Sequence, residues 1–196
     1  MQWQTLGQVS PAALSDGRAE LQRAAQAHGG APLEWDAGRA ALLGPGTAGG
    51  ERPVVAVAGE LAPWYADADL LLRDVAAREP GLGPIRVWPP ELDMAAVLRF
   101  DGGAPREGER QIRIGLSLGD QHHPEPYLYL APSPIEVDVT FPPLPSGGRW
   151  QRAGFIGAIL LASDLLQGPP DGQPKRARAW LEAALATGRH LIAARR

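Results

Sequence analysis

The chain has 196 residues, enough for a substantial core, and we expect a single α+β domain over residues 1–196. An apolar fraction of 44% and a charged fraction of 21% are ordinary for a globular protein and argue against wholesale disorder. The absence of cysteine excludes disulfides, thiolate metal sites and a cysteine nucleophile. The formal net charge of −3 is too small to indicate a partner.

The N-terminal sequence has no basic region followed by an apolar region, so we expect no signal peptide. No apolar run approaches the ~18 residues that a membrane span needs, so we expect no membrane partner. The longest apolar stretch begins at Gly154 and is typical of a buried strand or helix. We therefore expect a soluble, cytoplasmic protein.

Helix and strand signals alternate in the first half of the chain. Ser10 followed by Pro11 is typical of a helix start, and the glycines at 29–30 would end that helix. Residues 33–35 predict the start of a short strand or hairpin. The β-branched run at 54–57 predicts a buried strand.

Two further helices are expected, one beginning near Pro63 and one near Pro174. Their apolar residues recur at spacings of three and four, which predicts one buried stripe on each helix. The first stripe consists of Trp64, Ala68, Leu71, Leu72 and Val75. The second consists of Trp180, Leu181, Ala184, Leu185, Gly188, Leu191 and Ile192.

Between these helices the pattern is rich in strands. Short strands are expected at 85–88 and 95–100, and apolar residues alternate with polar ones at 112–118, 127–130 and 135–141. Loops rather than helices connect these strands, which favours a mainly antiparallel sheet with about three covering helices.

The crowded segment at 119–129 is the best candidate site, together with the segment at 88–93. Carboxylates and imidazoles at a loop could bind a ligand or a metal, or share acid and base roles. The candidate residues are Trp88, Asp93, Asp120, His122, His123, Glu125, Tyr127 and Tyr129. A solvated loop is the alternative, with Asp120 serving the turn and Glu125 at the rim of a strand.

A bound metal is not expected, and no cofactor is predicted. Neighbouring side chains of an extended segment face opposite ways, so His122 and His123 would not both reach one ion. One of the two histidines, with Glu125, is the better pair for a site.

Two sequence patterns resemble known functional motifs but lack the neighbouring residues or structure that those motifs require. Residues 115–119 match G-x-S-x-G, but Ser117 lies within an alternating strand and the following residues cannot open a helix, as a nucleophile elbow requires. The glycine-rich stretch at 44–50 lacks the lysine and hydroxyl residue of a phosphate-binding loop.

The last 22 residues carry a formal charge of +5, which leaves −8 for the rest of the chain. A basic helix can contact nucleic acid. Because cations suit the end of a helix and the overall field is negative, we expect this helix to pack on its own sheet, with no nucleic-acid partner.

Four segments, at 59–72, 84–98, 114–132 and 154–166, resemble a family of uncharacterised bacterial proteins. The resemblance covers most of the chain and implies a whole domain and a site location, but no activity. Relatives tend to read His-His-Phe-Asp after the tryptophan-proline pair. This chain has Pro90, Glu91, Leu92 and Asp93 there, so it keeps the aspartate and lacks the histidines.

The leading functional hypothesis is a small-molecule-binding pocket lined by the 88–93 and 119–129 segments. One alternative is a noncatalytic structural or interaction protein, including a homo-oligomer formed through residues 135–141 or 141–148. A further alternative is an acid–base or metal-assisted hydrolase. An enzyme and a noncatalytic protein therefore both stay open.

Overall fold

The computed structural model describes residues 2–10, 12–15, 19, 33–34, 53–88, 93–101, 108–136 and 138–193, with the backbone alone at 33–34 and 53–59. Three predictions fall outside this part of the chain: most of the first helix, the glycine-rich loop at 44–50, and residues 90–92. The start of the first helix is confirmed. Residues 12–15 are helical, and Ser10 Oγ accepts the amide of Ala13 at 3.1 Å.

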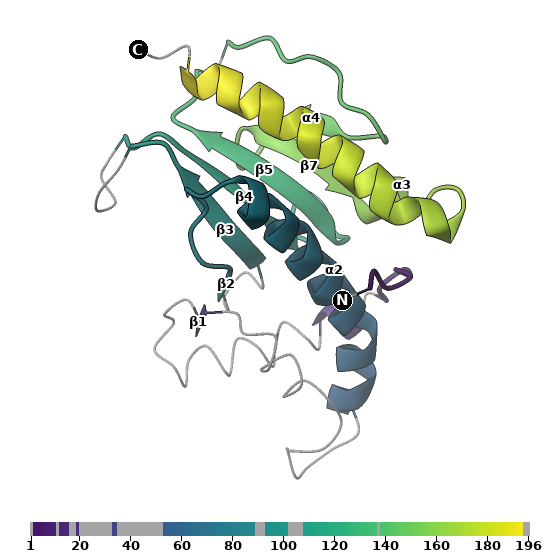
Figure 1. Cartoon of the computed structure of the whole chain (residues 1–196). Helices are drawn as coiled ribbons and strands as arrows, with labels where there is room; N and C mark the ends of the chain where they lie inside the picture. Colours follow the sequence, from purple (N-terminus) through teal and green to yellow (C-terminus); the bar gives the residue numbers. More distant parts are fainter. Residues whose placement is uncertain are drawn as a thin grey trace.

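The predicted α+β architecture with an antiparallel sheet is confirmed (Figure 1). Within the described residues the strands form one seven-stranded sheet in the order β1-β2-β3-β4-β5-β7-β6, and every neighbouring pair is antiparallel. The strands are β1 (Leu33–Glu34), β2 (Arg86–Trp88), β3 (Asp93–Arg99), β4 (Gln111–Ser117), β5 (Tyr127–Ser133), β6 (Arg149–Gln151) and β7 (Gly157–Leu161).

Two long helices, α2 (Pro53–Arg78) and α4 (Gln173–Ala193), lie side by side across one face of the sheet (Figure 1). α2 contacts β3 and β4, and α4 contacts β4, β5 and β7. The short helix α3 (Ala162–Leu165) follows β7, and the single 3₁₀ turn η2 (Pro170–Gly172) leads into α4.

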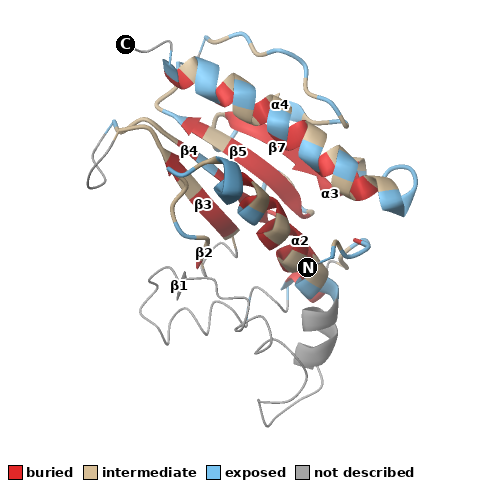
Figure 2. Cartoon of the chain, in the orientation of Figure 1, coloured by how far each residue is buried: buried red, intermediate tan, exposed pale blue. Residues whose placement is uncertain are grey.

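Most residues of the apolar stripes predicted for α2 and α4 are buried against the sheet, and Leu185 and Leu191 of α4 are half-buried (Figure 2). They pack on alternate strand residues, including Met94, Leu116 and Leu128, because successive side chains of a strand point to opposite faces. The other face carries a second, separate cluster that contains no helix residue: Ala95, Tyr127, Tyr129, Ile159 and Leu161, with Trp88 and Phe155 packed against it. We call it the tyrosine face.

The strand predicted at 54–57 is wrong, because these residues lie in the first turns of α2. A short β-branched run does not by itself distinguish a strand from a buried helix. The start predicted for this helix, near Pro63, is also wrong, because α2 begins at Pro53. Proline usually marks a helix start because it lacks an N–H and clashes with the preceding turn, yet here it lies inside α2.

The strand predicted at 135–141 is also wrong, since the described residues of that segment belong to no strand. Prolines border it on both sides and cannot donate to a ladder. Phe141 instead stacks on Trp150 of the edge strand β6, with ring centroids 4.3 Å apart. Trp150 Nε1 also donates to the carbonyl of Pro142 at 2.9 Å.

Ion pairs between α2 and α4 account for cations of the basic terminal helix. Arg178 faces Asp74 of α2 at 3.8 Å, and Arg189 pairs with Glu79, the residue that follows α2. A further pair has its cation on α2 and its carboxylate on α4: Arg78 lies 3.3 Å from Glu182. Within the described part of the chain, no helix combines the length and apolarity that a membrane crossing requires.

Candidate functional site

Strand register brings polar side chains from four strands to the tyrosine face. Trp88 of β2 pairs with Asp93 of β3, and Ser117 of β4 pairs with Tyr127 of β5. Two residues further along, Gly115 of β4 lies between Ala95 and Tyr129. The alternation that buries Met94 and Leu116 under the helices therefore places their neighbours Asp93 and Ser117 on the opposite face.

Tyr129 reaches across β4 to Asp93 because Gly115 has no side chain. A Cβ at Gly115 would lie 3.0 Å from Cζ of the Tyr129 ring, so the ring lies over this glycine. Burial raises the pKa of Tyr129 well above its ordinary value, and the charge of Asp93 and its hydrogen bond with the phenol raise it further. Tyr129 is therefore a neutral hydrogen-bond donor whose acceptor is the Asp93 carboxylate.

Asp120 organises the turn between β4 and β5. Its Oδ1 accepts the amides of His122 at 2.7 Å and His123 at 2.8 Å, and its own amide donates to the carbonyl of His123 at 2.8 Å. Its Oδ2 accepts the phenol of Tyr127 at 2.7 Å. Burial alone would raise the pKa of Asp120, but the hydrogen bonds from Tyr127 and the two amides outweigh it and lower the pKa. The carboxylate is thus held ionised beside Tyr127.

Tyr127 is the residue on which both carboxylates act. Burial raises the pKa of its phenol, a hydrogen bond with Ser117 lowers it, and the hydrogen bond to Asp120 and the charges of Asp120 and Asp93 raise it. Its ring continues an aromatic row, with the Tyr129 ring 6.2 Å away and Phe155 a further 5.9 Å beyond Tyr129. Asp93, Asp120, Tyr127 and Tyr129 therefore form one connected group.

The two adjacent histidines differ, as the sequence predicts for neighbouring side chains. The ring of His123 lies 5.5 Å from Tyr127, edge to face, and its Nε2 is 2.5 Å from Oε1 of Gln151 on β6. His122 is exposed and lies near Gln121 and Gly154. Of the pair, His123 faces the group.

Glu125 has a different task from the other candidate residues. Its carboxylate accepts the backbone amide of Ser163 at 2.6 Å and the Ser163 hydroxyl at 2.9 Å. The carbonyl of Pro126 accepts the amide of Ala162 at 2.8 Å. Because the first amides of a helix have no partner within it, these contacts cap α3. The structure does not bring Glu125 together with the tyrosines.

Four residues that lie beside the predicted site residues were not themselves predicted. Ser117 and Gly115 have the strand parity that places them there, so the alternation of β4 could have identified them. Arg113 has the same parity, and its guanidinium lies 5.6 Å from the ring of Trp88. Gln151 has no sequence signal, because β6 itself is too short to show a period.

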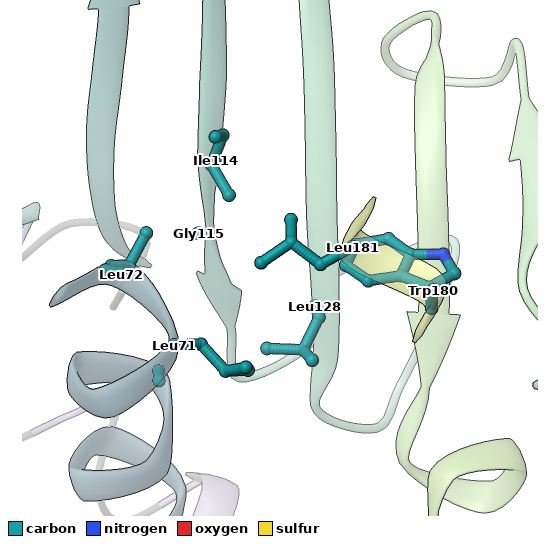
Figure 3. Close-up of a pocket in the computed structure, with 8 residues that line it drawn as sticks. Leu71, Leu72, Ile114, Gly115, Leu128, Trp180 and Leu181 are labelled. Atoms are coloured by element: carbon teal, nitrogen blue, oxygen red, sulfur yellow. The ribbon is translucent and has the colours of Figure 1, made fainter. Parts of the chain in front are cut away.

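An apolar cavity of about 10 Å³ lies on the opposite side of the sheet, between α2 and α4 (Figure 3). Its lining residues are Ala68, Leu71, Leu72, Ile114, Gly115, Leu128, Trp180 and Leu181. A space of this size holds no more than about one water molecule, and its walls offer such a molecule few polar partners. The connected group of Asp93, Asp120, Tyr127 and Tyr129 lies away from this cavity, so we locate the candidate site at the tyrosine face.

Among the described residues, no group of three or more histidines and carboxylates is arranged to hold a metal ion. Compared with protein-family models, with curated proteins and with solved structures, the chain has no match. The functional argument therefore rests on the geometry of the tyrosine face.

Proposed function

We propose that this protein binds a small polar molecule on the tyrosine face of its sheet. The observation that supports the proposal most directly is the position of Tyr127. Its phenol donates to Asp120 at 2.7 Å and is also subject to the charge of Asp93. Two carboxylates from separate parts of the chain thus act on one buried hydroxyl, which is the convergence of polar groups among aromatic walls that binding sites show.

The hydrogen-bond roles of the group favour a ligand that carries donors, such as hydroxyl or ammonium groups. Both tyrosines donate their hydroxyl hydrogens to carboxylates, so the tyrosine atoms that can face a ligand are acceptor oxygens, and that of Tyr127 already accepts a hydrogen bond from Ser117. Trp88 pairs with Asp93 and offers an aromatic surface, and the guanidinium of Arg113, 5.6 Å from its ring, supports a preference of this surface for cations. Arg113 also limits the net negative charge of the site.

The experiment is a thermal-shift screen with three sets of compounds, namely small amines, polyols and carboxylates, because a ligand that favours the native state raises its stability. Compounds that stabilise the protein are then measured by isothermal titration calorimetry with wild type, Asp93→Asn and Asp138→Asn. Asp138 is an exposed aspartate away from the group and serves as the matched control.

We expect amines or polyols to stabilise the protein and carboxylates to have no effect. Asp93→Asn should weaken binding at least about tenfold, the equivalent of 1.4 kcal/mol, while Asp138→Asn should bind as wild type does. Stabilisation by carboxylates alone, or equal affinity of Asp93→Asn and wild type, would contradict the proposal.

A further inference from the structure

The N-terminal segment, residues 2–10, is held on the helices by side chains that bond to its backbone. Gln173, at the start of α4, accepts the amide of Leu6 at 3.0 Å and donates to its carbonyl at 3.2 Å, as a neighbouring strand would. Trp64 of α2 donates from Nε1 to the carbonyl of Gly7 at 3.2 Å. Leu6 is buried in the main core by these contacts.

A buried carboxylate of α2 lies under the same segment. Asp67 is only 1% exposed, and its Oδ1 accepts the amide of Gln4 at 2.8 Å. Its Oδ2 is sealed from solvent and has no hydrogen-bond partner within the described part of the chain, and neither has Nε1 of the nearby Trp3. An ionised carboxylate with one hydrogen bond is costly to bury, whereas the neutral acid is much less so. Binding of the segment over Asp67 therefore favours the protonated form.

Within the described part of the chain, no charged partner compensates Asp67. The segment from Gln2 to Ser10 contains no ionisable side chain. The charged side chains on the elements that meet at the segment are Glu60, Asp69, Arg73, Asp171, Lys175 and Arg176. Arg73 is engaged by Asp69 at 2.8 Å, and Arg176 by the carbonyls of Leu165 and Pro169.

We propose that residues 2–10 form a pH-responsive strap, which binds α2 most tightly when Asp67 is protonated and loosens when Asp67 ionises. Burial raises the pKa of Asp67 from 3.8 to about 7, and the amide of Gln4 offsets part of the effect. Because the pKa is raised in the bound state, the binding free energy of the strap is greatest below about pH 4. It falls as the pH rises towards 7 and is constant above that.

The test is amide hydrogen exchange by NMR on the full chain between pH 5 and pH 8, corrected for the intrinsic exchange rate. The amides of Gln4 and Leu6 are direct probes, since the first donates to Asp67 and the second to Gln173. The variant is Asp67→Asn, which keeps an oxygen acceptor for Gln4 and does not ionise. The matched control is Glu60→Gln, because Glu60 also accepts a strap amide, that of Ser10 at 2.8 Å, but is exposed.

In wild type and in Glu60→Gln, the protection of both amides should fall several-fold per pH unit between pH 5 and 7, with an upper limit of about tenfold. Asp67→Asn should remove this dependence and keep the protection high. A flat wild-type profile would overturn the proposal, and so would a dependence that persists in Asp67→Asn. A change at Gln4 without one at Leu6 would also overturn it, because the strap would then not loosen as a unit.

Discussion

Replacement of Gly115 by alanine tests the close approach on which the tyrosine face depends. The added Cβ would lie 2.4 Å from the carbonyl oxygen of Met94, 2.7 Å from the Cβ of Ala95 and 3.0 Å from Cζ of Tyr129. Ordinary contacts begin near 3.4 Å, so β3 and β4 would have to separate by about 1 Å in the middle of the sheet. The first obstacle is backbone, which cannot move aside as a flexible side chain can.

Overpacking of this kind typically costs about 1–3 kcal/mol, and we expect Gly115→Ala to lie at or above the upper end. Urea denaturation followed by tryptophan fluorescence and by circular dichroism measures the free energy of unfolding. Gly7→Ala is the matched control, because a Cβ at Gly7 would meet nothing within 4 Å. Its effect should stay within about 0.5 kcal/mol. If Gly115→Ala were as stable as Gly7→Ala, the arrangement of β3, β4 and Tyr129 described above would be refuted.

Three further predictions concern the polar groups of the site and its surroundings. Tyr129→Phe removes the donor to Asp93 and should lower the free energy of unfolding by about 1–3 kcal/mol in the same urea assay; an unchanged value would contradict the hydrogen bond. Glu125→Ala removes the acceptor for Ser163 at the start of α3 and should cost about 1 kcal/mol, against no measurable loss for Asp138→Ala. Metal analysis of the dialysed protein should find no stoichiometric metal, and close to one equivalent of zinc or manganese per chain would overturn that expectation.

Most elements that the sequence predicts correctly have a regular period, but a period alone is not sufficient, since residues 135–141 alternate and their described residues belong to no strand. The alternation through Ile112, Ile114 and Leu116 predicts β4, and the spacing of Trp180, Leu181 and Ala184 predicts the buried stripe of α4. The run at 54–57 fails because four residues are too few to separate a period of 2 from one of 3.6. β6 is missed because three residues show no period at all.

The candidate site is predictable where the strands are regular and not elsewhere. Tyr127 and Tyr129 share a face because they are two residues apart in β5. The register between β4 and β5 then places Tyr127 opposite Ser117 and Tyr129 opposite Gly115. Glu125 has the same parity but precedes the strand, so alternation does not govern it and its carboxylate turns to α3. The partnership of His123 with a distant glutamine depends on tertiary structure alone.

The polar side chains on the tyrosine face are hydrogen-bonded to one another, and this pairing limits how much they contribute to the net stability of the fold. A buried phenol and a carboxylate that satisfy each other add little net stability, since apolar groups of the same shape would often serve as well. Removing one partner is costly because the other stays buried and unsatisfied. Net stability therefore gives little reason for Asp93, Tyr127 and Tyr129 in these positions, whereas Asp120 also holds the turn between β4 and β5. The presence of these three polar residues on one face of the sheet supports the proposed binding of a ligand there, which the Asp93→Asn titration tests.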